Sequence, residues 1–234
     1  MKTTMNVARG LLLCAAVALS QPVLAQAPGG LKEKLLAAKQ AAAQSQQALR
    51  SYTWIEKTEL SYKGEVKNTK INSCRYGTDG KVQKTVIQEP PPADKKPGLR
   101  GKIIEKKKGE MQEELQAAMA LVHQYVPPDP GLIQVVIGAG QASLSQQGPE
   151  LVALTFPNYL KAGDALTLTL DSAFKAMRRI GVTTYMDDPA KPVTLAVQMA
   201  SLPDASYPAS VTLGIPASSI EVRVTNSNYQ RVAP

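Results

Sequence analysis

The side chains that most often carry chemistry are sparse in this sequence and form no recognisable catalytic pattern. His123 is the single histidine of the 234 residues, and Cys14 and Cys74 are the two cysteines. The chain contains no Gly-x-Ser-x-Gly, His-Glu-x-x-His or Cys-x-x-Cys motif, and its acidic residues show no spacing that singles out a carboxylate pair. We therefore expect a protein that is not an enzyme, with no catalytic residue, no metal site and no cofactor.

The isolated histidine and cysteines have structural interpretations. His123 lies next to an apolar stripe and is predicted to be partly buried and hydrogen-bonded. Cys74 is predicted to be a small buried apolar group, and Cys14 belongs to an apolar run near the N-terminus.

A basic cluster is the strongest charge feature of the chain. Between residues 94 and 108, seven lysine and arginine side chains stand against two acidic ones. Two interpretations stay open: a solvated loop and helix start, or a surface attracted to an anionic membrane or an acidic envelope partner. Nucleic acid is not expected as a partner, because the cluster has no aromatic residue that could stack on bases. The candidate surface consists of Arg100, Lys102, Lys106, Lys107 and Lys108.

The first residues have the pattern of an export signal. Lys2 and Arg9 precede a short apolar run over residues 11–19, which is too short to span a bilayer. Val23, Leu24 and Ala25 offer a cleavage site after Ala25. We expect a signal peptide over residues 1–25, a single domain over residues 26–234, and a periplasmic location.

Five consecutive β-strands are predicted between residues 164 and 226. Apolar and polar residues alternate along each of them, as in Leu166, Leu168 and Leu170 against Thr167 and Thr169. Neighbouring side chains of a strand point to opposite faces, so this period gives a sheet with one apolar face. Short links with turn residues favour an antiparallel meander.

The remaining elements precede this meander. Alanine-rich residues 31–49 predict a surface helix, and residues 52–62, 66–76 and 82–87 predict three more polar strands. A proline-rich loop follows over residues 89–98, inside the domain. Residues 100–126 predict an amphipathic helix that could begin only at Gly109, and residues 131–137 fit either a helix or a strand. The fold class is α+β: a curved antiparallel meander packed on one or two amphipathic helices, with an N-terminal helix.

The apolar stripe of the central helix would face the apolar side of the meander. It is a core by default, and it becomes the wall of a ligand cavity if the sheet curves away from the helix. The candidate cavity residues are Met111, Leu115, Met119 and Val122 on the helix, and Leu168, Val182, Leu195 and Val197 on the strands.

This order of elements resembles the LolA/LolB/RseB-like fold of exported bacterial proteins, an open half-barrel curled around internal helices. The resemblance covers most of the chain after residue 25 and rests on order and pattern. It implies an apolar cavity that shelters acyl chains or senses lipoproteins.

Two functions follow as expectations. The first is an exported, non-catalytic envelope protein that binds a lipid or a lipidated partner in the concavity between sheet and helix. The second is a structural or protein-interaction module of the envelope, with a filled core and no ligand.

Overall fold

The computed structural model describes residues 28–89, 99–173 and 176–232. The predicted signal peptide and residues 90–98 of the predicted proline-rich loop lie outside the described residues. The described part contains three α-helices and a 3-10 helix, η1: α1 (Pro28–Leu49), α2 (Leu99–Val122), α3 (Pro130–Gly138) and η1 (Pro216–Ser218). Its strands are β1 (Tyr52–Tyr62), β2 (Glu65–Tyr76), β3 (Val82–Gln88), β4 (Ser143–Gln146), β5 (Leu151–Pro157), β6 (Ala165–Asp171), β7 (Met177–Tyr185), β8 (Pro192–Ser201), β9 (Ser206–Ile215) and β10 (Ile220–Arg231).

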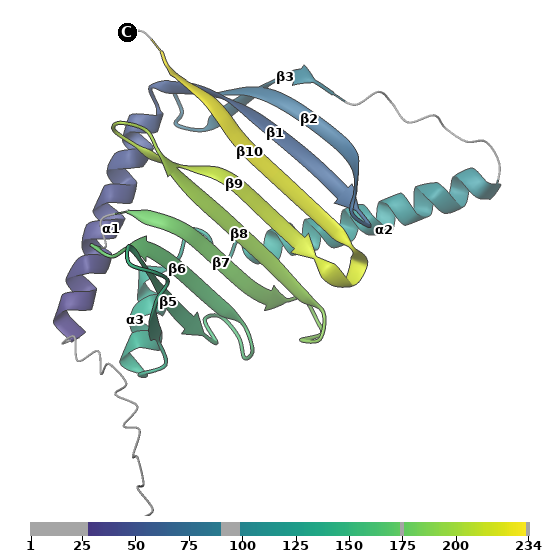
Figure 1. Ribbon diagram of the computed structural model, residues 1–234. Helices are drawn as coiled ribbons and strands as arrows, with labels where there is room; N and C mark the ends of the chain where they lie inside the picture. The colour runs from purple at the N-terminus through teal and green to yellow at the C-terminus, as the bar shows by residue number, and fades with distance from the viewer. Residues whose placement is uncertain (1–27, 90–98, 174–175, 233–234) are drawn as a thin grey trace, which may run out of the picture.

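The strands form one open antiparallel sheet, which confirms the predicted α+β fold class. Its order is β3-β2-β1-β10-β9-β8-β7-β6-β5-β4, so β3 and β4 are the edges (Figure 1). Strands β1–β3 precede α2 and α3 in the sequence, and strands β4–β10 follow them. The pairing of β1 with β10 joins these two meanders into a single curved sheet. The five strands predicted between residues 164 and 226 are present as β6 to β10.

The alternation along the strands produces the two unlike faces that it predicted. Leu166, Leu168 and Leu170 are 0–2% exposed, whereas Thr167 and Thr169 lie half-buried on the opposite face. The register continues this division across the sheet. The apolar face, called the inner face below, carries the aligned row Leu154, Leu168, Ile180, Val197 and Val211.

Two helices cover part of the inner face. α2 passes behind the sheet in Figure 1 and extends beyond it at its N-terminal end. Its last turns pack against the strands, because Ala118 and Val122 are buried in the apolar core. The helix begins at Leu99, so Gly109 lies inside it and does not start it.

Residues 130–138 form a helix, which decides between the two alternatives left open by the sequence. Asp129 caps α3 by accepting hydrogen bonds from the backbone N–H groups of Gly131 and Leu132, and Pro130 occupies the first turn. Ile133 and Val136 then bury one side of the helix in the core. Proline and the cap favour a helix at a place where the apolar pattern alone was ambiguous.

The N-terminal elements form the other end of the sheet. α1 lies along the strand ends (Figure 1), where Ser45 Oγ accepts a hydrogen bond from the backbone N–H of Ser206 at 3.1 Å. All seven residues of β3 are exposed, as expected for a polar edge strand. Lys63 and Gly64 turn β1 into β2 with positive φ angles of 54° and 78°, the backbone conformation of a tight hairpin turn.

Within the described ranges, none of the helices combines the length and the apolar character that crossing a bilayer requires.

Candidate functional site

A buried polar contact fixes the end of α2 against the sheet. The hydroxyl of Tyr125 donates to Asp164 Oδ2 at 2.6 Å and lies 2.7 Å from the hydroxyl of Thr184. Asp164 also accepts from the backbone N–H groups of Leu160 and Lys161. Burial, followed by the hydrogen bond to Asp164, raises the pKa of Tyr125 well above its usual range, so the phenol stays neutral. This contact holds the chain between α2 and α3 in place and so sets how α2 lies on the inner face.

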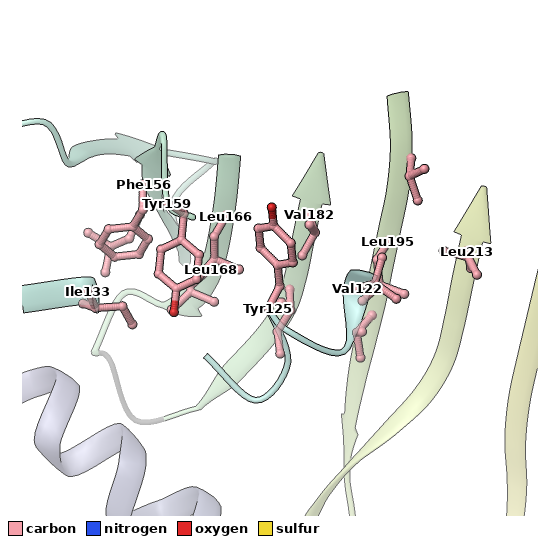
Figure 2. Packing of buried hydrophobic residues seen from close by; sticks show 14 of the residues in the cluster. Val122, Tyr125, Ile133, Phe156, Tyr159, Leu166, Leu168, Val182, Leu195 and Leu213 are labelled. Atoms are coloured by element: carbon pink, nitrogen blue, oxygen red, sulfur yellow. The ribbon is translucent and has the colours of Figure 1, made fainter. Parts of the chain in front are cut away.

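The inner face beneath the end of α2 is filled. Leu168, Val182, Leu195 and Val197 are 2–7% exposed and belong to one apolar cluster with Val122. Figure 2 shows this cluster, with Val122 and Tyr125 turned toward the side chains of the strands. These five candidate cavity residues therefore lie in a packed core in this structure.

The inner face is more open towards the N-terminal part of α2. Leu60 of β1, Val211 of β9 and Val222 of β10 are partly buried and pack against the core cluster. Met111 and Leu115 of α2 are partly buried in the same way. Two of the eight candidate cavity residues, Met111 and Leu115, thus lie where apolar surface remains accessible.

Met119 differs from the other helix candidates, because 44% of its surface is exposed. It is adjacent in sequence to the fully buried Ala118, which occupies the position that faces the sheet. Near this part of α2, the hydroxyl of Ser218 donates to Glu114, which links the helix to the connection between β9 and β10. α2 therefore packs on the sheet with one stripe of side chains, Met111, Leu115, Ala118 and Val122, and Met119 lies beside that stripe.

The basic candidates lie on the N-terminal half of α2. Lys106, Lys107 and Lys108 are exposed, and Lys106 makes a 3.8 Å ion pair with Glu110 one turn along the helix. Arg100 and Lys102 belong to α2, but their side chains fall outside the described residues. The three described lysines form a solvent-facing surface away from the packed core, called the lysine surface below.

His123 is exposed, and the prediction of a partly buried histidine is wrong. α2 ends at Val122, directly before His123. The residues that turn to the sheet here are Val122 and Tyr125, which precede and follow His123 in the sequence. Cys74 is 1% exposed, as predicted, and burial raises the pKa of its thiol. In the part of the chain that the structure describes, no group of three or more His, Cys, Asp or Glu side chains could hold a metal ion.

A cavity that the sequence did not reveal lies on the inner face, at the end of the sheet near α1. It has a volume of about 330 Å³ and is lined by aromatic and polar side chains that include Trp54, Glu56 and Tyr229. The rings of Trp54 and Tyr229 are stacked at 5.5 Å, and the Glu56 carboxylate lies 2.7 Å from Lys84 Nζ. The sequence offered one signal for this cavity, the placement of Tyr52 and Trp54 on the same face of a predicted strand. The residues that complete the cavity come from other strands, among them β2, β3 and β10.

Comparisons with known proteins find distant likenesses of the fold. No protein-family model matches the chain, and no curated protein matches it. Among solved structures, a DUF1329 family protein from Desulfovibrio piger is similar, with 10% identity, a TM-score of 0.39, and coverage of 86% of this chain and 92% of that one. A LolA superfamily protein from Nitrosomonas europaea is similar with 7% identity, a TM-score of 0.35, and coverage of 84% and 94%.

One of these two structures is described as a LolA superfamily protein, the group that the order of elements resembles. Likenesses this distant carry no information on function, so the side chains of this chain have to supply it.

Proposed function

We propose that this chain is an exported, non-catalytic envelope protein that binds the apolar part of a lipid or a lipidated partner between α2 and the inner face of the sheet. The observation that carries the proposal is the partly exposed apolar surface formed by Leu60, Val211 and Val222 together with Met111 and Leu115. An apolar surface left partly open inside a fold is stabilised when an apolar ligand removes it from water.

The way α2 is attached makes the site adjustable. Its last turns are buried with Ala118 and Val122, whereas residues 105–108 at its other end are exposed. A ligand would enter by lifting this half of the helix, with Tyr125 and Asp164 as the fixed end. The cost is small, because few apolar contacts are lost where the helix is already exposed.

The first experiment measures lipid in the purified protein. Native mass spectrometry and solvent extraction of the chain from residue 26 should reveal bound lipid, and lipid-free protein should take up a fluorescent fatty acid. Protein without lipid that also takes up no fatty acid would contradict the proposal.

A pair of neighbouring substitutions separates the two faces of the sheet. Val224 lies on the inner face opposite Val211, and Thr225 lies on the outer face opposite Ser210. V224E should reduce fatty-acid uptake at least tenfold, because it places a carboxylate beside the acyl chain, whereas T225E should not. Equal effects of the two substitutions would show that the fatty acid binds elsewhere.

The filled half of the inner face favours a second candidate function. A structural or protein-interaction module would retain the packed core around Leu168 and Leu195 and bind no lipid. This candidate predicts that an envelope protein is retained by the immobilised chain and that the chain carries no lipid.

A further inference from the structure

The aromatic cavity at the α1 end of the sheet is separate from the apolar surface beneath α2. It lies on the same inner face, because Trp54 and Glu56 share the parity of Leu60 along β1. Its volume of about 330 Å³ is at the lower end of the range for ligand pockets, which fits a small polar group and not an acyl chain.

One polar side chain that lines this cavity, Asn226, has an acceptor without a partner among the described residues. It donates from Nδ2 to the carbonyl oxygen of Pro208 at 2.8 Å, and the acceptor without a partner is its buried Oδ1. Asn72 on β2 is not one of the lining residues, but it donates to the lining residue Glu56 at Oε1 over 3.1 Å; it is 4% exposed, and its buried Oδ1 has no partner among the described residues. Buried acceptors without partners are unfavourable, so a ligand with N–H donors would stabilise this arrangement.

The aromatic rings favour a positively charged donor. Trp54 contacts Tyr229 and Tyr76, each at 5.5 Å between ring centroids, and Tyr229 contacts Tyr207 at 4.1 Å. Aromatic rings attract cations through their quadrupole. A primary ammonium group has three N–H donors, whereas a quaternary ammonium group has none, so the unpartnered Oδ1 of Asn226 and the carboxylate of Glu56 favour the primary form.

Lys84 adds a requirement for an anion. Its ammonium group binds both oxygens of Glu56 at 2.7 Å, its side chain is one of those that line the cavity, and 49% of that side chain is exposed. A simple amine would be repelled by this lysine, but an amine joined to a phosphate would place its anionic oxygens on Lys84.

We infer that this cavity binds a phosphoethanolamine-type group, with its primary ammonium at Asn226 and Glu56 among the aromatic rings and its phosphate at Lys84. Such a group occurs in a free headgroup and in a phospholipid. The phospholipid source rests on the proposed function, because the acyl chains would have to reach the apolar surface beneath α2. That surface begins at Leu60, about 13 Å along β1 from Glu56.

Intrinsic fluorescence provides a direct measurement, because Trp54 is the single tryptophan of the sequence. Glycerophosphoethanolamine should change the Trp54 emission in a saturable way. Glycerophosphocholine, which lacks the N–H donors, and glycerophosphoglycerol, which lacks the amine, should bind at least tenfold more weakly. Equal binding of the ethanolamine and choline compounds would overturn the inference.

Matched ion-pair variants test the assignment of residues. E56Q and K84Q should each weaken binding of glycerophosphoethanolamine at least tenfold. E59Q and K57Q change the ion pair between Lys57 and Glu59, which lies on the opposite face of the same strand at 2.6 Å, and should leave binding unchanged. Circular dichroism of all four variants checks folding, and a folded E56Q that binds like the parent chain would also overturn the inference.

Vesicles distinguish the two sources of the group. A Trp54 response to phosphatidylethanolamine vesicles, but not to phosphatidylcholine vesicles, supports the lipid source even if the soluble headgroup binds weakly. No response to either the soluble compound or the ethanolamine vesicles contradicts the inference. If glycerophosphoethanolamine binds while fatty-acid uptake is absent, the cavity stands and the proposed function beneath α2 fails.

Discussion

At the scale of single residues, one hydroxyl group connects three separate parts of the chain. Tyr125 follows α2, Asp164 precedes β6, and Thr184 lies in β7, and all three side chains are buried. Asp164 Oδ1 has no hydrogen-bond partner among the described residues, so the carboxylate depends on the groups that bind Oδ2. Removing one of these groups leaves a buried charge less well satisfied, which is more costly than the loss of an exposed hydrogen bond.

We expect Y125F to lower the free energy of unfolding by about 1–3 kcal/mol, because Asp164 loses its hydroxyl donor. Urea unfolding followed by circular dichroism measures the change. Y62F removes a hydroxyl from an exposed tyrosine at the end of β1 and should change stability by less than about 0.5 kcal/mol. Equal stability of Y125F and the parent chain would show that the buried contact contributes little.

The same contact predicts an effect of alkaline pH. The pKa of Tyr125 is raised in the folded chain above the ordinary value of 10.0, so the unfolded chain releases this proton first. The contribution of the neutral Tyr125 hydroxyl to the free energy of unfolding is fully present below about pH 10 and is lost as the pH rises above it. Stability measured from pH 8 to 11 should therefore fall less steeply in Y125F than in the parent chain.

At the scale of elements, α2 combines two surfaces with different partners. Its last turns are buried against the sheet, whereas Lys106, Lys107 and Lys108 are exposed near its other end. Exposed lysines contribute little to folding, but each contributes about 1 kcal/mol to binding when it lies near an anionic membrane surface. The lysine surface could therefore bring the partly exposed apolar surface beneath α2 close to a membrane.

We expect the triple substitution of Lys106, Lys107 and Lys108 by glutamate to abolish binding to vesicles that contain anionic lipid, without unfolding the chain. Vesicle flotation at low and at 0.5 M salt measures this, because salt weakens exposed charge interactions. A control with the same change of charge replaces the exposed Lys63, Lys67 and Lys191. If both triple variants lose binding equally, net charge alone accounts for it.

At the scale of the whole molecule, the inner face has a filled part, a partly open apolar part and an aromatic cavity. Leu168 is 2% exposed in the filled part, whereas Leu60 is partly buried in the open part. The register places them on the same face of one continuous sheet. A ligand would therefore affect the open part first and leave the filled part as the stable support.

We expect L168A to destabilise the chain by about 2–5 kcal/mol, because it creates a cavity in a packed core. L60A should cost clearly less, because part of Leu60 is already exposed to water, and it should reduce fatty-acid uptake instead. Thermal unfolding and the uptake assay are measured on both variants. A small effect of L168A on stability would indicate that the space around it is a ligand cavity even without lipid.

The sequence by itself determined most of the elements and the faces of the sheet, whereas the structure decided that residues 130–138 form a helix and that α2 begins at Leu99. The alternation in Leu166, Leu168 and Leu170 and the stripe with Ala118 and Val122 reflect local geometry, because side-chain direction follows from strand and helix periods of two and 3.6 residues. It also predicted the burial of Cys74 and the helices before a long meander.

Only the tertiary structure decided what lies between these surfaces. Periodicity shows which residues face inward but not how far apart two inward faces are, so the filled space around Leu168 could not be told from a cavity. The pairing of β1 with β10, which brings Trp54 to Tyr229, joins strands more than 150 residues apart in sequence. No local pattern encodes such a contact, because it depends on how distant strands pair within the whole sheet.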